Sequence, residues 1–159
     1  MSSDYFVKVK EAEGESDKKG HTGEIEITSW SWGLANMSSA GSGGGMGLGK
    51  AAPQDLHFTA DLSKATPNLI KANAKGSHLA DLKLTARKSA EGQEDYMVIT
   101  LTDVFITSVS IGGSSGGGVS TTVSCAFKKF KIEYKFQDAK GALKAGPEFT
   151  WDISKSEFA

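Results

Sequence analysis

The chain has 159 residues, and its 18 Lys and Arg side chains against 19 Asp and Glu give a net charge of -1 with the three histidines neutral. That length suits one domain, or at most two very small ones. Arg87 is the only arginine, so the side chain that best grips phosphates and base edges is scarce and we expect no nucleic-acid partner. Cys125 is the only cysteine, which excludes an internal disulfide and a set of cysteine ligands for zinc. Since no apolar stretch is long enough for a secretory signal or a spanning helix, we expect neither a signal peptide nor membrane insertion.

Most apolar residues alternate with polar ones, which is the two-residue period of half-buried strands. Eight or so short strands with polar turns between them predict an antiparallel sandwich or barrel. In chain order the alternation covers 5–9, 25–33, 56–62, 82–86, 96–111, 119–136 and 149–153.

One short helix is predicted after the third of these strands. Thr66 suits the N-cap, Pro67 the first helical position and Gly76 the position just past the end. A helix of this length depends on docking against the sheet for its stability.

Changes of parity within the predicted strands carry information about the packing. Ile25 and Ile27 share one parity whereas Trp30 and Trp32 have the other, so either a bulge flips the strand near Thr28 or both faces of the strand are covered.

The two longest predicted strands also change sides. The stretch 97–111 is apolar on both parities, which indicates a central strand or one covered by another subunit. In 119–136 the apolar side switches near Lys128 and Lys129, where a bend would let one strand serve two packed sheets.

Two glycine-rich segments interrupt the alternation, GSGGGMGLG at 41–49 and GGSSGGG at 112–118. Ordering such segments costs much conformational entropy, so we expect them to be mobile in a free monomer. The first lies in a predicted extended loop over 34–54, and a segment of that length in a compact domain is typically functional or disordered. It is long enough to reach beyond its own domain.

Three features of the sequence could indicate a nucleotide site, a metal site or a catalytic cysteine. The segment 44–51 fits the phosphate-loop pattern only up to its last position, because Ala51 replaces the Ser or Thr that would hold magnesium and Pro53 follows where a helix should begin. The three histidines are too scattered in sequence for a typical metal site. Cys125 shares its parity with apolar neighbours, which favours a small buried core residue over a nucleophile. We therefore expect no catalytic residues, no metal and no cofactor.

Charged side chains divide between the two ends of the chain. They are either solvated faces or opposite surfaces that meet head to tail between copies, and the sequence leaves both open. The lysines are Lys128, Lys129, Lys131, Lys135, Lys140 and Lys144, and the acids are Glu11, Glu13, Glu15, Asp17, Glu24 and Glu26.

Several short motifs follow one another along nearly the whole chain. They include Gly14-Glu15-Ser16, Ser29-Trp30-Ser31-Trp32-Gly33, Ala65-Thr66-Pro67-Asn68-Leu69, Arg87-Lys88, Ser108-Val109-Ser110 and Trp151-Asp152-Ile153. In these motifs the chain resembles the haemolysin-coregulated proteins (Hcp), the tube-forming subunits of bacterial type VI secretion systems. The tryptophan motif and the Thr-Pro helix start carry most of the specificity.

The resemblance implies a single domain over residues 1–159, a compact β-barrel of two antiparallel sheets with one short α-helix at its side, assembling into hexameric rings. It implies that rings stack into a tube, which a contractile sheath expels beneath a trimeric spike, and that small effector proteins are held in the lumen. It also implies residence in the bacterial cytoplasm before firing and secretion afterwards without a signal peptide.

The resemblance also nominates site residues. Ser31 matches a serine that faces the channel in the family, and Ser29 is its neighbour of the same parity, so both are expected to contact effectors. The residues expected at subunit interfaces or in ring stacking are Trp30, Trp32, Gly43, Gly44, Gly45, Met46, Leu48 and Lys50. The alternative from another class is a monomeric β-sandwich ligand-binding module whose glycine loops form the site.

Overall fold

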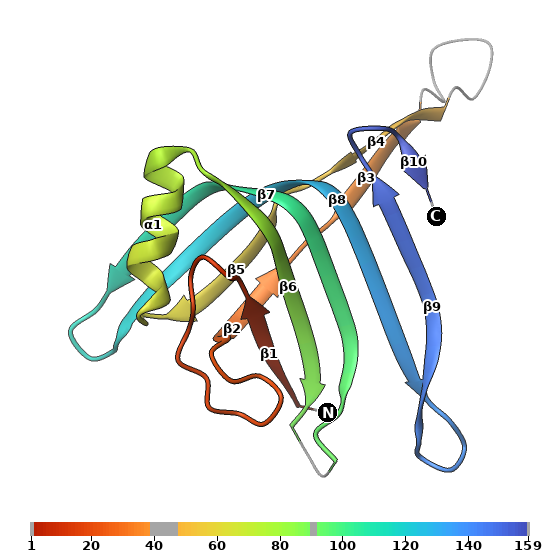
Figure 1. The fold of residues 1–159 in the computed structure, drawn as a ribbon, viewed down its shortest axis with the longest axis horizontal. Coiled ribbons are helices and arrows are strands. Elements are labelled where there is room, and N and C mark those ends of the chain that lie inside the picture. Colours follow the sequence, from red (N-terminus) through yellow and green to blue (C-terminus); the bar gives the residue numbers. More distant parts are fainter. Residues whose placement is uncertain (1, 39–47, 90–91, 159) are drawn as a thin grey trace.

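Figure 1 shows the computed structural model of the chain, which describes residues 2–38, 48–89 and 92–158. One helix and ten strands make up this part of the chain. In order they are β1 (Ser3–Lys8), β2 (Ile25–Ser31), β3 (Leu34–Ser38), β4 (Leu48–Pro53), β5 (Leu56–Asp61), α1 (Ala65–Lys75), β6 (His78–Lys88), β7 (Asp95–Gly113), β8 (Val119–Gln137), β9 (Leu143–Asp152) and β10 (Glu157–Phe158).

Six of the strands close into a barrel. They pair antiparallel in the order β8-β5-β2-β1-β6-β7, and β7 returns to pair with β8. β9 and β10 extend this sheet from β8, and α1 lies at the side of the barrel (Figure 1). The predicted β-barrel with one helix is thereby confirmed, with its wall formed by one continuous sheet.

The barrel interior is filled by the apolar residues of the alternating pattern. Because side chains of a strand point alternately to its two faces, one parity of each strand supplies the core. Among the fully buried residues are Val7, Leu56, Leu82, Leu84, Leu101, Val104, Ile106, Val123 and Cys125, each 0% exposed. Cys125 is thus a core residue, as its parity predicted.

A bulge in β2 accounts for the parity change before the tryptophans. The register with β5 shifts between Ile27 and Ser29, so Thr28 is the extra residue. After the bulge Trp30 and Trp32 point to the same side as Ile27 and pack, partly buried, against the core. The first of the two alternatives for this strand is the correct one.

Three neighbouring strands change sides at one level of the barrel. Asp103 of β7 has a left-handed φ of 55°, and its Oδ2 lies 3.1 Å from Lys128 Nζ of β8. In each strand the buried residues on either side of this level are separated by an odd number of positions, so the buried face changes. These residues are Leu79 and Leu82 in β6, Leu101 and Val104 in β7, and Cys125 and Phe130 in β8. The predicted change of sides near Lys128 is confirmed, and here β8 exchanges β5 for β9 as its partner within one continuous sheet.

β7 is a central strand over its first half only. From Asp95 to Phe105 it is hydrogen-bonded to β6 on one side and to β8 on the other, and beyond Phe105 it pairs with β8 alone. The first half agrees with the prediction of a central strand, and for the second half the alternative of cover by another subunit stays a prediction.

The helix begins earlier than predicted. Ala65 is its first residue, Lys64 occupies the N-cap without a side-chain hydrogen bond, and Thr66 is therefore inside the helix and not its cap. Thr66 Oγ1 accepts a hydrogen bond from the Ser63 amide at 3.2 Å, and this local contact replaces the expected cap. Gly76 ends the helix with a left-handed φ of 64°, as predicted. With 11 residues, α1 is too short to cross a membrane, and no other helix occurs among the described residues.

The segment predicted as a loop over 34–54 is more ordered than expected at its two arms. β3 and β4 pair in antiparallel register, for example Leu34 with Pro53 and Asn36 with Ala51. This β3–β4 ribbon projects away from the barrel (Figure 1), and residues 39–47 between the arms lie outside the described part. The other glycine-rich segment forms the turn between β7 and β8, where the Gly117 amide donates to the Ser114 carbonyl at 3.1 Å.

Candidate functional site

Short polar side chains gather on the outer face of four adjacent strands. The core-facing residues Trp30, Phe58, Val123 and Val109 alternate with them in β2, β5, β8 and β7. Strand register aligns the outward residues in two rows, Ser31-His57-Ser124-Ser108 and Ser29-Thr59-Thr122-Ser110. These eight residues are called the hydroxyl face below.

The hydroxyl face offers hydrogen bonds and little charge. His57 Nδ1 lies 2.6 Å from Ser124 Oγ, and Thr59 Oγ1 lies 3.3 Å from Thr122 Oγ1. Ser124 is 8% exposed, whereas Ser29 and Ser31 are open to solvent. None of the eight is Lys, Arg, Asp or Glu. Such a face can bind a polar protein surface without requiring a complementary charge.

Both serines nominated from the sequence belong to the hydroxyl face, in adjacent positions of β2. The other members were not nominated, because cross-strand register is invisible in the sequence. The alternation of Ser108 and Ser110 about Val109 was the signal available for β7.

The four strands of this face end in two free edges. Within the residues that the structure describes, β2 pairs beyond Ile27 with β5 alone. Similarly β7 pairs beyond Phe105 with β8 alone, although Asn73 Nδ2 of α1 donates to the Ile106 carbonyl at 2.7 Å. Because each pair in β2-β5-β8-β7 is antiparallel, the two edge strands run in opposite directions.

The two tryptophans nominated for subunit contacts lie partly buried in the chain's own core. The Trp30 ring meets Tyr5 edge to face with centroids 6.1 Å apart, and Trp32 stacks on Phe130 at 4.3 Å. The part of each indole that is still exposed is open to a neighbour, so their interface role stays a prediction.

The remaining nominated residues belong to the sequence segment 34–54. Leu48 and Lys50 belong to β4, but only their backbone is described. Gly43, Gly44, Gly45 and Met46 lie outside the described residues.

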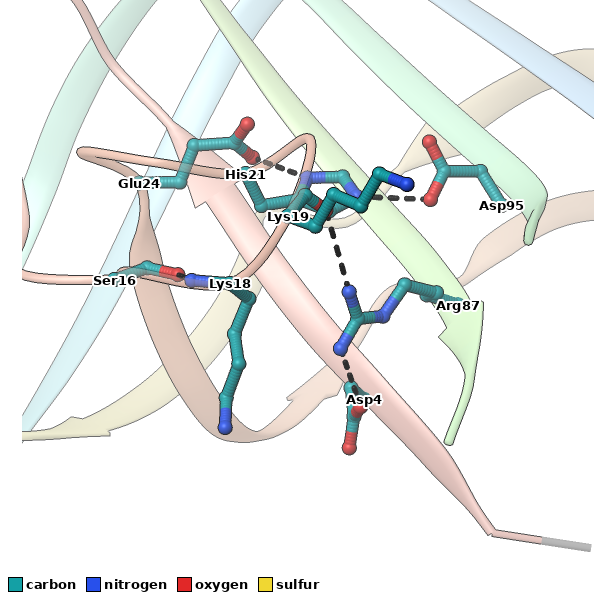
Figure 2. Close-up of polar contacts among 8 residues, drawn as sticks. All are labelled: Asp4, Ser16, Lys18, Lys19, His21, Glu24, Arg87 and Asp95. Carbon is teal, nitrogen blue, oxygen red and sulfur yellow. Dashed lines mark hydrogen bonds and ion pairs between the residues drawn. The ribbon is translucent and has the colours of Figure 1, made fainter. Parts of the chain in front are cut away.

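A second polar cluster lies on the opposite part of the barrel and is drawn in Figure 2. Arg87 of β6 is 2% exposed, and its Nη2 donates to Asp4 Oδ2 of β1 at 3.0 Å. The guanidinium carbon lies 5.1 Å from the centre of the Phe6 ring, a cation–π contact. A longer hydrogen bond of 3.4 Å reaches from Nη1 to the Lys19 carbonyl.

His21 occupies the other side of this cluster (Figure 2). Its ring stacks on Phe6 at 4.2 Å. Nδ1 lies 3.0 Å from Glu24 Oε1, and Nε2 lies 2.8 Å from Asp95 Oδ1. Sequence reasoning weighed His21 only as a metal ligand and missed these partners, since Asp95 is 74 residues away.

The sequence motifs for enzyme chemistry have ordinary surroundings in the structure. Lys50 and Ala51 lie in β4, which is followed by β5 and not by the helix that a phosphate loop requires. Burial raises the pKa of the Cys125 thiol to about 12, and the Asp55 carboxylate adds to the shift. A thiol with so high a pKa is a poor nucleophile at neutral pH.

Comparison with known proteins agrees with the fold and the motifs. Residues 6–134 match the protein family described as "Type VI secretion system effector, Hcp". The chain is 45% identical, over 159 residues and 98% of each chain, to protein hcp1 of Pseudomonas aeruginosa.

Solved structures of similar shape come from the same secretion system. A type six secretion system protein superposes with a TM-score of 0.93 at 25% identity, covering 99% of this chain and 100% of that one. Hcp1 of Salmonella typhimurium gives a TM-score of 0.79 at 27% identity with 100% of each chain covered. A type VI secretion system effector of Yersinia pestis gives 0.76 at 28% identity over 94% of this chain and 100% of the other. The chain described here therefore belongs to the Hcp family of type VI secretion system proteins.

Proposed function

We propose that the chain is a structural subunit of the type VI secretion tube, which forms hexameric rings and holds small effector proteins in their lumen. The observation that carries this proposal is the hydroxyl face, a four-stranded polar surface that ends in two free antiparallel edges. A face of this kind is suited to join other copies at its edges and to line a channel.

Ring formation follows from pairing the two edges. The β7 edge of one copy can pair antiparallel with the β2 edge of the next, which is a head-to-tail contact that closes when the rotation between neighbours allows it. Such pairing would satisfy the free backbone groups of both edges. It would also join the hydroxyl faces of all copies into one continuous lining.

Stacking of rings needs contacts outside the barrel. The β3–β4 ribbon projects from the barrel (Figure 1) and is the element suited to reach an adjacent ring. Leu48 and Lys50 of β4, together with Gly43, Gly44, Gly45 and Met46 of the same sequence segment, are proposed to take part in this contact. Trp30 and Trp32 are proposed to contribute their exposed parts to the contact between neighbours. Near-zero net charge favours this dense packing, because many copies of one sign would repel each other.

Effector binding is assigned to the lining. Ser31 and Ser29 are proposed to contact cargo through hydrogen bonds, which suit cargo that must be both held and released. The tube is proposed to be expelled by a contractile sheath beneath a trimeric spike, to start in the bacterial cytoplasm and to end outside the cell. The chain has a structural role in this process and no catalytic one.

Light scattering coupled to size exclusion tests the ring. The expected mass is six times the 16.8 kDa of one chain, and electron microscopy of the same sample should show rings. A mass of one chain at high concentration would favour the ligand-binding module instead.

Disulfide trapping tests the edge pairing. Ser29→Cys combined in turn with Ser108→Cys or Ser110→Cys places thiols at opposite ends of the hydroxyl face. Within one chain they are separated by two strands, about 14 Å across, which is too far for a disulfide. Oxidation should give a ladder of covalent multimers ending at six, and Ser29→Cys with Lys83→Cys on β6 should give none. A ladder from the control pair, or none from either test pair, would refute the pairing.

A further inference from the structure

In the loop between β1 and β2, residues 9–24, one histidine contacts both the end of the loop and the barrel. His21 is 5% exposed, and its two ring nitrogens contact carboxylates from different parts of the chain. Nδ1 lies 3.0 Å from Glu24 Oε1 at the end of the loop, and Nε2 lies 2.8 Å from Asp95 Oδ1 at the start of β7 (Figure 2).

With Glu24 and Asp95 both ionised, this geometry calls for a proton on each ring nitrogen of His21. An ionised carboxylate can only accept hydrogen bonds, so both ring nitrogens must donate. A neutral imidazole carries one N–H and would turn a lone pair toward one of the two carboxylates. The closed contact therefore belongs to the doubly protonated ring, which is a charged donor to both partners.

The other charged groups near Glu24 and Asp95 have different partners or positions. Arg87 of β6 lies across the Phe6 ring, but its guanidinium bonds to Asp4 of β1 and to the Lys19 carbonyl. Lys19 and His21 line a hollow of about 1040 Å³ on this side of the barrel. Of the residues that the structure describes, the other charged ones that line it are Glu94, Asp95, Arg87 and Lys135. Among the described residues, His21 is the side chain that contacts both Glu24 and Asp95.

The rest of the loop tip is bonded mainly to itself. The Gly23 amide donates to the Ser16 carbonyl at 2.8 Å, and the His21 amide donates to the Lys18 carbonyl at 2.9 Å. Lys18 and Lys19 are exposed. In the described part of the chain, two side-chain hydrogen bonds join the tip to the barrel strands, and the His21–Asp95 contact at 2.8 Å is shorter than the Arg87–Lys19 contact at 3.4 Å. The His21 ring also stacks on Phe6 of β1.

We propose that His21 is a proton-dependent latch on the outer wall of the barrel. The latch is closed while both ring nitrogens carry protons, and loss of the Nε2 proton releases the tip of the β1–β2 loop from Asp95. Release exposes Lys18 and Lys19 further and opens the adjoining hollow. This property goes beyond the proposed secretion role and does not depend on ring formation.

Limited trypsin digestion of the full-length protein tests the latch. Cleavage after Lys18 and Lys19 is measured relative to cleavage after Lys140, an exposed site in the β8–β9 turn, so that the pH dependence of trypsin cancels. Between pH 6 and pH 8.5 we expect the ratio to rise about tenfold, as the loss of one charge-assisted hydrogen bond implies. An unchanged ratio would overturn the proposal.

Two isosteric variants sharpen the test. In Asp95→Asn the amide can donate to Nε2 while Nδ1–H still donates to Glu24, so a neutral ring satisfies both contacts and the ratio should vary less than about twofold with pH. Asp103→Asn alters the exposed contact of His78, where Nδ1 lies 2.8 Å from Asp103 Oδ1, and should behave like the parent. A full pH dependence in Asp95→Asn would contradict the latch.

Nitrogen NMR of the imidazole rings gives a readout that needs no variant. At pH 6 both nitrogens of His21 should show the chemical shifts of protonated nitrogens, and one should lose that shift over the pH range in which tryptic cleavage rises. A His21 ring with one deprotonated nitrogen at pH 6, in protein that resists cleavage at the loop, would overturn the proposal.

Discussion

Gly14 is the position where one added methyl group should do the most damage. A Cβ built there would lie 2.4 Å from the Glu24 carbonyl oxygen and 2.7 Å from Ile25 Cα. Both obstacles are backbone atoms, so no side-chain rotation can relieve the contact. Ordinary contacts begin at 3.4 Å, and Gly14→Ala therefore forces the loop and the start of β2 apart by about 1 Å.

The energetic cost follows from what this displacement breaks. Overpacking in a tight interior costs about 1–3 kcal/mol. The Gly14 amide donates to the Gly23 carbonyl at 2.9 Å, and the Ser16 amide donates to the Glu24 carbonyl at 3.0 Å. Weakening these two hydrogen bonds adds about 1 kcal/mol. We expect Gly14→Ala to lower the free energy of unfolding by about 3 kcal/mol, which lowers Tm by about 6–12 °C in a chain of this size.

Thermal unfolding followed by circular dichroism at fixed protein concentration measures this shift. Gly116→Ala is the matched control, because an added Cβ at Gly116 has no heavy atom within 4 Å. We expect its Tm to stay within about 1 °C of the parent. If Gly14→Ala unfolds within 2 °C of the parent, the loop is free to move away and the packing described here is wrong.

Three further predictions concern the hydroxyl face, the buried Cys125 and the contact between Asp103 and Lys128. Ser31→Arg should leave the particle mass unchanged and abolish export of at least one small cargo, because a long cation would occupy the lining; normal export from intact rings would count against it. The Cys125 thiol, with a pKa raised by burial to about 12, should react with thiol reagents at pH 8 about a thousandfold more slowly in folded protein than in urea, and equal rates would show that the site opens. Lys128 and, more weakly, His78 hold the pKa of Asp103 below its usual range, so its carboxylate stabilises the fold above the unfolded pKa and loses this effect as pH falls through the folded one. The Tm difference between the parent and Asp103→Asn should therefore be present at pH 7 and disappear in acid, once pH has fallen below the folded pKa of Asp103, whereas a constant difference would exclude the carboxylate as its source.

Alternation of apolar residues was sufficient to predict most of the barrel. Phe58 and Val123 point inward at positions that their parity alone specified. The bulge at Thr28 was predicted as one of two options because a parity change must be absorbed somewhere in the strand. Sequence could not decide between them, since a second covered face and a bulge leave the same pattern of Ile27 and Trp30.

The errors have equally local causes. Thr66 is a residue type typical of an N-cap, but the Lys64 backbone is already right-handed, with φ -63° and ψ -16°, so the helix begins at Ala65, one residue before Thr66. The arms of 34–54 read as loop because glycine and alanine carry no alternation, yet Asn36 and Ala51 pair across a ladder. Backbone hydrogen bonds hold such a ribbon together, and they leave no apolar pattern in the sequence from which it could be predicted.

The hydroxyl face and the His21 cluster depend on a kind of information that a single sequence lacks. Ser31 is 93 residues from Ser124, yet His57 lies between them in register and contacts Ser124 at 2.6 Å. Only the order in which strands pair brings these residues together, and that order depends on many weak core contacts at once. The resemblance to a family could identify Ser31 because this residue lies within a contiguous sequence motif. It could not point to His57 or Asp95, which owe their surroundings to strands that meet only when the barrel closes. Variants of His57 and Asp95, more than variants within the motifs, therefore test the contacts that form only when the barrel closes.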